Sequence, residues 1–412
     1  MACLESIQSN GAHRAWIDSR NSDGRGEVKE NFESIQRSCY PGVTIKRRSP
    51  SSRAHKELEL LKKPVRLADV AKAAGVSHGT ASNVFSRPEI VRKEVRDLVL
   101  AKAHELGYAG PDPKGRLLRA GKVNAIGVAT AEPLSYFFDD PFARVVMSGI
   151  SQGCDATGAG ISLVSAINKE QLAWNIQSAL VDGFIVFCIE DGSRVVELTR
   201  ERKLPFVALD FGFDDETIAA IWVDDFEGSR MAARHLAELG HRRFAVLSLP
   251  IAESGFGPAS LQRAKGAVFS GTRNRVRGYF EVLTEFGIDT ATVPIYETLN
   301  DELTVRAGLE HIFASDQAPT AILAMSDRIA LIALDWLKER GIAVPQQVSI
   351  VGFDGVPEGA VSHPPLTTVA QPMVEMGRRA VQNILEFDGR VRRETLDVEL
   401  IVRKSTAPVG AG

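Results

Sequence analysis

The stretch RLADVAKAAGVSHGTASNVF, residues 66–85, decides the first part of the fold. Its apolar spacing predicts two short helices around a tight turn at Ala74-Gly75-Val76-Ser77. A third helix is expected from about Arg92 to Leu106, where Gly107 ends it. The small apolar residues that would form the core of these helices are Ala71, Val76, Ala81 and Val84. The pattern predicts an all-α domain built on a helix-turn-helix.

The second helix of such a motif can read DNA, because its N-terminal side chains face base edges in the major groove. Here Ser77 can cap that helix, and the hydroxyls of Ser77 and Thr80 are short enough to reach phosphates. Asn83 suits bidentate contact with adenine. The residues predicted to face DNA are Ser77, His78, Gly79, Thr80, Ser82 and Asn83. Without DNA, the same stretch is only a tight helical corner whose small residues permit close packing.

Charge is distributed unevenly along the 412-residue chain, whose formal net charge is −3. Residues 62–121 hold 12 Lys and Arg against 6 Asp and Glu, whereas residues 122–412 hold 27 against 38. A basic module on an acidic body indicates that one end meets a polyanion.

Beyond Val123 short apolar strands alternate with helical spacing, as in NAIGVAT, DGFIVF, PFVALD, TAILAMS and VSIVGFD. Strands separated by helices of 10–15 residues predict parallel βαβ units. About nine such strands are too many for one sheet of this kind, so two α/β lobes are expected. The stretch ESGFGPASLQRAKGAVFSG, residues 253–271, reads as a mobile loop or an insertion between them.

The motif DVAKAAGVS, the helix end LGY and the segment RLLRAG together resemble the lactose/galactose-repressor (LacI/GalR) family. The segments GHRRFAVLS, VSIVGFDGV, HPPLTTVAQPM and LIVRKSTAP extend the resemblance from Arg66 to Pro408. It implies a two-lobed α/β core like that of periplasmic binding proteins (type I), behind an N-terminal all-α helix-turn-helix domain. The expected domains are an N-terminal extension at 1–61, either disordered or upstream of the true start codon; the DNA-binding domain at 62–109; a hinge helix or linker at 110–121; and a ligand-binding and dimerisation core at 122–408.

The resemblance also assigns DNA contacts. It places His78, Gly79 and Asn83 at base-reading positions, although Gly79 replaces a larger side chain and offers no side-chain contact. In the hinge it implies that Leu118 wedges into the minor groove, with Arg116 and Arg119 beside it. Arg92 stands where relatives have a helix-capping serine, and the lost cap should cost about 1 kcal/mol locally.

Ligands of open α/β sheets bind beyond the carboxyl ends of the strands. Asp210, Ser326 and Asp354 end predicted strands, and Asp139 and Asp140 lie in a loop of the first lobe. The resemblance adds Arg275, Gln371 and Met373 as cleft residues; Ser326 stands where many relatives have asparagine. Carboxylates with one arginine suit a polyhydroxylated effector, so a carbohydrate is expected.

Several function classes are disfavoured. The four cysteines are scattered, and no nucleophile elbow, HExxH motif or metal cluster is evident, so no enzyme, cofactor or metal is expected. No apolar run reaches the roughly 20 residues that span a bilayer, and no signal peptide is apparent, which predicts a cytoplasmic protein without a membrane partner. The expected partners are double-stranded operator DNA, a small-molecule effector and a second copy in a homodimer. The alternative is a solute-binding protein of a transporter with no DNA role.

Overall fold

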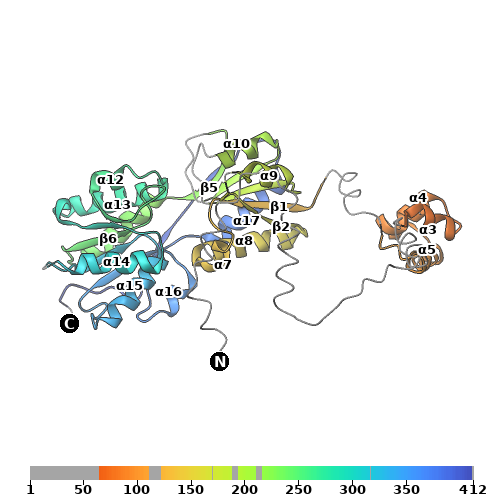
Figure 1. Ribbon diagram of the computed structural model, residues 1–412. Helices are drawn as coiled ribbons and strands as arrows, with labels where there is room; N and C mark the ends of the chain where they lie inside the picture. The colour runs from red at the N-terminus through yellow and green to blue at the C-terminus, as the bar shows by residue number, and fades with distance from the viewer. Residues whose placement is uncertain are drawn as a thin grey trace, which may run out of the picture. The chain divides into compact units, whose positions relative to one another are not determined.

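The computed structural model describes residues 65–110, 122–168, 170–187, 194–209, 216–315 and 317–410. The chain divides into two compact units, one ending at Asp112 and one beginning at Pro113. They are called the head and the core below (Figure 1). The predicted hinge residues Arg116, Leu118 and Arg119 lie outside the described residues, as do the segment 1–61 and Asp210.

The head is a three-helix domain. Its helices are α3 (Leu67–Ala73), α4 (His78–Ser86) and α5 (Lys93–Glu105), with a short 3-10 turn, η1 (Pro88–Ile90). Gly75, at φ +65°, makes the turn between α3 and α4 in a conformation that favours glycine. The core of the head consists of Val70, Ala71, Ala74, Ala81, Val84, Val99 and Ala103, with Val76 packed against it.

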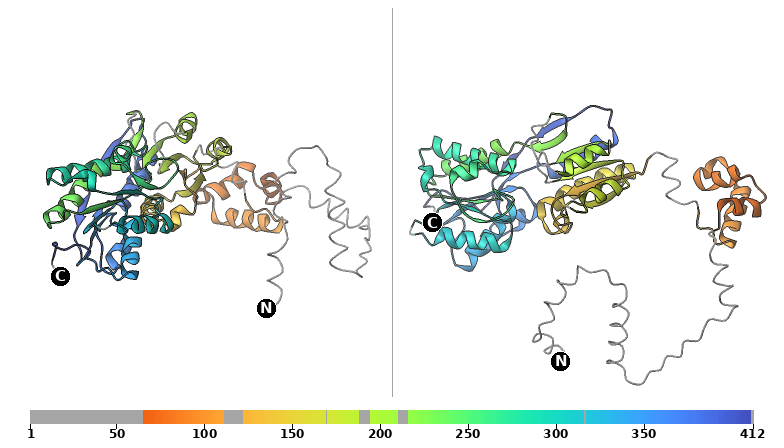
Figure 2. Two further views of the ribbon diagram at one scale, coloured as in Figure 1. Left: turned by 60° about the vertical axis from the view of Figure 1, so that its left-hand side comes forward. Right: turned by 45° about the horizontal axis from the view of Figure 1, so that its top comes forward.

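The first lobe of the core has a six-stranded parallel sheet in the order β12-β5-β4-β3-β1-β2. Its strands are β1 (Ala125–Thr130), β2 (Gly160–Ser165), β3 (Gly183–Phe187), β4 (Phe206–Leu209), β5 (Ala219–Val223) and β12 (Arg393–Leu396). The helices are α7 (Tyr136–Asp139), α8 (Pro141–Thr157), α9 (Leu172–Ser178), α10 (Arg194–Glu201) and α17 (Met373–Leu385). One apolar cluster joins the sheet to α8 and α17, and a second joins it to α9 and α10, so helices cover both faces (Figure 2).

The second lobe has a seven-stranded sheet in the order β13-β11-β10-β9-β6-β8-β7, antiparallel only at its two edges. Its strands are β6 (Phe244–Ser248), β7 (Gly257–Ala259), β8 (Ile295–Glu297), β9 (Ala321–Ala324), β10 (Ser349–Asp354), β11 (Thr367–Ala370) and β13 (Glu399–Ile401). Its main helices are α11 (Asp225–Glu238), α13 (Ser270–Glu285), α14 (Glu302–Phe313) and α15 (Asp327–Glu339), with the short helices α12 (Leu261–Lys265) and α16 (Pro357–Val361). Helices α11 and α13 pack on one face, and α14 and α15 on the other.

The chain passes between the lobes three times: from β5 to α11, from β11 to α17, and from β12 to β13. The two α/β lobes are the predicted architecture of the core. The structure differs at residues 253–271, which were expected to form a mobile loop or an insertion between the lobes. This stretch forms β7, α12 and the start of α13, and β7 pairs with β8 at the edge of the second sheet. A three-residue edge strand is too short to show the alternation that identifies strands in a sequence.

No helix in the described part of the chain is both long and apolar enough to cross a bilayer.

Candidate functional site

Helix α4 of the head separates its apolar and polar residues. Ala81 and Val84 are buried, whereas His78 and Gly79 are exposed and Thr80, Ser82 and Asn83 are partly exposed. Ser77 caps the helix as predicted: its Oγ accepts a hydrogen bond from the Thr80 backbone N–H at 3.0 Å. The polar side chains therefore lie on the side of α4 that the three-helix core leaves open.

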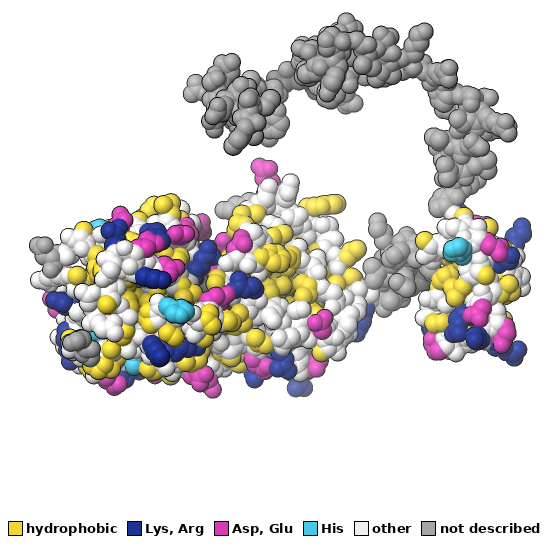
Figure 3. Space-filling view, turned by 90° about the horizontal axis from the view of Figure 1, so that it is seen from below, with side chains coloured by type: hydrophobic (Ala, Val, Ile, Leu, Met, Phe, Trp, Pro, Cys, Tyr) yellow, Lys and Arg dark blue, Asp and Glu magenta, His cyan; other side chains and the backbone are white. Residues whose placement is uncertain are grey.

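The described head is only moderately basic. Residues 65–110 hold 7 Lys and Arg against 5 Asp and Glu, so most of the positive excess of residues 62–121 lies in the segments that flank this range. Lys and Arg side chains are visible on the surface of the head beside Asp and Glu (Figure 3). Arg92 precedes α5 and makes no side-chain capping bond, in agreement with the predicted loss of a cap.

A cavity of about 390 Å³ lies in the core and is lined by residues of both lobes. The first lobe contributes the loop after β1, α7 and the start of α8; the second contributes the ends of β6, β8, β9 and β10 and the starts of α11 and α13. The polar and charged lining residues are Glu132, Ser135, Tyr136, Asp139, Asp140, Asp225, Thr272, Arg275, Asn300, Asp301, Ser326, Arg328 and Asp354. Phe142, Leu249, Phe269 and Leu299 add apolar surface. A cavity with apolar walls and converging polar groups is typical of a small-molecule site.

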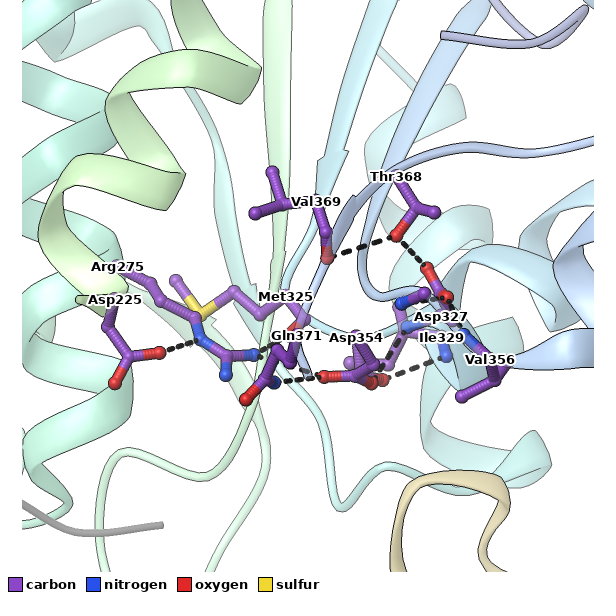
Figure 4. A network of polar contacts seen from close by, with 12 residues as sticks. Asp225, Arg275, Met325, Asp327, Ile329, Asp354, Val356, Thr368, Val369 and Gln371 are labelled. Carbon is purple, nitrogen blue, oxygen red and sulfur yellow. Dashed lines mark hydrogen bonds and ion pairs between the residues drawn. The ribbon is translucent and has the colours of Figure 1, made fainter. Parts of the chain in front are cut away.

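Arg275 is one of two cations in the cavity lining, and Figure 4 shows its polar contacts. It lies on α13 and is 4% exposed. Its Nε donates to Oδ1 of Asp225 at 2.8 Å, and its Nη1 donates to the Met325 carbonyl. The guanidinium carbon lies 3.7 Å from the centroid of the Phe353 ring, in a cation–π contact. These contacts fix the planar group at the edge of the cavity.

Asp354 ends β10 with φ +124° and is buried beside Arg275, 3.9 Å from its Nη1. Its Oδ1 accepts from Nε2 of Gln371 at 2.9 Å, and its Oδ2 accepts from the backbone N–H of Asp327. Burial raises the pKa of Asp354; the charge of Arg275 opposes this shift and that of Asp327 adds to it. The hydrogen bond from Gln371 holds the Asp354 carboxylate in place, and Gln371 itself does not line the cavity.

Asp327 lies behind Asp354 and is fully buried. Its carboxylate accepts from the backbone N–H groups of Gly355 and Val356, both at 2.8 Å, and from Oγ1 of Thr368 at 2.6 Å. Burial nevertheless raises the pKa of Asp327 to about 7. These bonds fix the loop after β10, from which Val356 lines the cavity.

A polar clasp crosses the cavity between the lobes. Asp140 is 1% exposed at the start of α8, and its Oδ2 accepts from Nδ2 of Asn300 at 3.2 Å and pairs with Nη1 of Arg328 at 3.4 Å. Ser326 donates from Oγ to Oδ1 of Asn300 at 2.7 Å. An amide thus enters the cavity from position 300, held by the hydroxyl of Ser326. Outside the cavity, Arg144 of α8 and Glu358 of α16 form a second ion pair between the lobes.

The cavity brings together five of the eight predicted effector residues, namely Asp139, Asp140, Arg275, Ser326 and Asp354. Gln371 supports Asp354 from below and Met373 is buried in the apolar core of the first lobe, so neither lines the cavity. Sequence reasoning missed Glu132, Asp225, Asn300 and Arg328. Glu132, Asp225 and Asn300 follow strands β1, β5 and β8 within three residues, so the strand-end rule would have found them had it been applied to every strand.

Comparison with known proteins identifies both parts of the chain. Residues 66–110 match the bacterial regulatory proteins of the lacI family, and residues 233–406 match the periplasmic binding protein-like domain. The HTH-type transcriptional regulator Rv3575c of Mycobacterium tuberculosis is 36% identical over 350 residues, which are 83% of this chain and 97% of that relative.

Solved structures give the same result. The structure of the lac repressor dimer bound to operator and the anti-inducer ONPF has a TM-score of 0.66 and 26% identity, covering 84% of this chain and 100% of that one. A LacI family transcriptional regulator from Enterococcus faecium with bound ribose has a TM-score of 0.59 and 25% identity, covering 69% and 99%.

A helix-turn-helix head joined to a two-lobed core with a cavity between its lobes defines a DNA-binding transcriptional regulator with a ligand-binding domain. The chain belongs to the LacI family. The relatives compared above are transcriptional regulators, and the alternative of a transporter's solute-binding protein is not favoured. Among the described residues, no group of three or more His, Cys, Asp or Glu side chains could hold a metal ion.

Proposed function

We propose that this protein is a repressor that binds operator DNA as a homodimer. Its affinity for that DNA falls or rises when a carbohydrate occupies the cavity between its lobes. One observation carries the proposal: Arg275, Asp354 and Asp140 converge on one cavity that both lobes line. A ligand in that position contacts both lobes, so its affinity depends on how they are arranged. A ligand that binds two arrangements unequally shifts their populations.

DNA recognition is assigned to the open side of α4. Asn83 contacts a base, His78 reads a second position, and Ser77, Thr80 and Ser82 bind backbone phosphates. Gly79 contributes no side chain, which permits close approach of the helix to the groove. In the hinge, Leu118 enters the minor groove between Arg116 and Arg119.

A homodimer is supported by the surface of the first lobe. Strand β2 is the edge of its sheet, and α9 packs beside it. Trp174 of α9 is 73% exposed, and Ile161, Ile167 and Leu180 on these elements and their flanks are also exposed. Exposed apolar residues grouped on an unpaired sheet edge are a marker of a protein interface. Twofold symmetry would present two heads to the halves of a pseudo-palindromic operator.

The effector is assigned to the carbohydrates because the cavity combines carboxylates, an amide, hydroxyls and aromatic side chains. Such a set accepts and donates hydrogen bonds to several hydroxyl groups while the rings contact the apolar face of a sugar. The ribose bound to the Enterococcus faecium regulator is in keeping with this assignment.

The test begins with selection of the full chain on random duplexes at moderate salt. We expect enrichment of a pseudo-palindromic duplex. At least one sugar from a panel should then weaken or strengthen binding of the protein to that duplex. Leu118→Ala should reduce affinity for that duplex and leave sugar affinity unchanged. Absence of any preferred duplex would overturn the DNA role, and an unchanged operator affinity in Leu118→Ala would overturn the hinge assignment.

A further inference from the structure

The charged groups of the cavity are strongly unbalanced. Its lining includes two cations, Arg275 and Arg328. Six carboxylates face them: Glu132, Asp139, Asp140, Asp225, Asp301 and Asp354.

Arg275 is already engaged by the protein. Its Nε is bonded to Asp225, its Nη1 to the Met325 carbonyl, and one of its faces is covered by the Phe353 ring. Asp354 also lies within ion-pair distance. A ligand phosphate or carboxylate could reach this guanidinium only in competition with buried carboxylates.

Arg328 is the second cation, and it pairs with Asp140 across the cavity. Asp140 is buried and carries its own negative charge, so an anionic ligand beside Arg328 would also lie beside Asp140. The described lining therefore offers no guanidinium that lacks a carboxylate partner.

Three carboxylates remain without an ion-pair partner among the described residues: Glu132, Asp139 and Asp301. Desolvation, followed by the negative charge of Asp140, raises the pKa of Glu132. Only the smaller part of this shift, which comes from Asp140, reflects a negative potential in the part of the cavity that the first lobe lines. An anionic ligand would meet the same potential.

The uncharged polar groups complete the site. Asn300 uses Oδ1 to accept from Ser326 and one amide hydrogen to bond Asp140, which leaves its second amide hydrogen for a ligand. Ser135 adds a hydroxyl to the lining, and the hydroxyl oxygen of Thr272 can accept a hydrogen bond while its proton is donated to the Pro250 carbonyl. These neutral groups suit the hydroxyl groups of a ligand and do not neutralise a formal negative charge.

We propose that the effector is an uncharged polyhydroxy compound, and that the carboxylates of the cavity reject the phosphorylated and carboxylated derivatives of the same sugar. The inference rests on the proposed carbohydrate function and narrows it to one charge class. The regulator then senses the sugar before it is phosphorylated or after its phosphate is removed, since the phosphate ester does not bind.

The experiment is calorimetric titration of the full chain with matched pairs: ribose and ribose 5-phosphate, glucose and glucose 6-phosphate, and further neutral pentoses and hexoses each with its phosphate ester. For any sugar that binds, we expect its phosphate ester to bind at least ~30-fold more weakly, which is about 2 kcal/mol, because the carboxylates of the cavity repel the phosphate. The ratio of the two dissociation constants, ester over parent sugar, should shrink as salt rises from about 20 mM to about 300 mM, since ions screen the repulsion.

A double variant, Glu132→Gln with Asp139→Asn, should reduce the ratio by about tenfold. Glu310→Gln with Glu339→Gln, which neutralises two exposed carboxylates on α14 and α15, serves as the matched control and should leave the ratio as it is. A phosphate ester that binds as tightly as its parent would overturn the charge rule while leaving the carbohydrate assignment intact. If no sugar or ester in the panel binds, both the carbohydrate assignment and this inference fail.

Discussion

Oδ2 of Asp140 in the first lobe accepts a hydrogen bond from Nδ2 of Asn300 in the second, at 3.2 Å. Asn300 adopts φ +56°, a conformation that asparagine tolerates better than most residues. Ser326 fixes the amide from the other side. The clasp joins the lobes at the cavity where the effector is proposed to bind, and it connects the occupancy of that cavity to the arrangement of the lobes.

Weakening this clasp should open the lobes. We expect Asn300→Gly, which keeps the positive φ available while removing the amide, and Arg328→Ala to lengthen the mean distance between the lobes. Förster transfer between dyes on exposed positions of the two lobes measures this distance. Arg340→Ala, which breaks a pair with Glu310 inside the second lobe, is the control. Equal transfer efficiencies in all variants would show that the clasp does not hold the lobes together.

Removing Arg275 should destabilise the second lobe. Asp225 and Asp354 would then be largely buried without their cation, and loss of one partner of a buried pair costs about 3–5 kcal/mol. Urea unfolding of Arg275→Ala measures the loss in free energy of unfolding. The double variant Arg275→Ala with Asp225→Ala should recover part of it, and strictly additive losses would argue against the pairing.

The Arg275 side chain should also be needed for the effector. Arg275→Lys keeps the charge but loses the planar group that bonds Asp225 and stacks on Phe353. We expect sugar-induced thermal stabilisation to fall strongly in Arg275→Lys and to vanish in Arg275→Ala and Asp354→Ala. Undiminished stabilisation in both alanine variants would remove these residues from the proposed site.

Stability should depend on pH through Asp327. Its pKa is about 7 in the folded protein against an ordinary value of 3.8, so the folded state binds this proton more tightly than the unfolded chain does. The resulting stabilisation is complete below the ordinary pKa and is lost as pH rises through about 7. Asp327→Asn removes the titration and can keep the bonds to Gly355, Val356 and Thr368. The Tm of this variant relative to the original chain should rise between pH 5 and pH 8; a constant difference would contradict the assignment.

Close helix packing in the first lobe should not tolerate a methyl group at Gly149 or Gly377. A Cβ at Gly149 would overlap the Val374 carbonyl of α17, and one at Gly377 would overlap the Val146 carbonyl of α8. Because both obstacles are backbone, we expect Gly149→Ala and Gly377→Ala each to cost about 1–3 kcal/mol of stability in urea unfolding. Gly79→Ala, where the nearest side-chain atom is 3.8 Å away, is the tolerated control.

The sequence alone determined the helix-turn-helix and the two-lobed α/β architecture, because these depend on local apolar periodicity, on Gly75 at the turn and on the alternation of strands with helices. It also identified Arg275, Ser326 and Asp354 as cavity residues, the first through the family resemblance and the other two because they end strands that point to one edge of a sheet. Local patterns of this kind do not depend on which distant segments meet.

Only the tertiary structure decided which side chains occupy the cavity and which support it. Gln371 and Met373 lie close together in sequence, yet one holds Asp354 from below and the other enters the core of the first lobe, because the chain crosses between the lobes at that point. The clasp of Asp140 with Asn300 and Arg328 joins residues 160 and 188 positions apart. Contacts at such separation follow from how the two lobes pack, and no pattern within either segment encodes them.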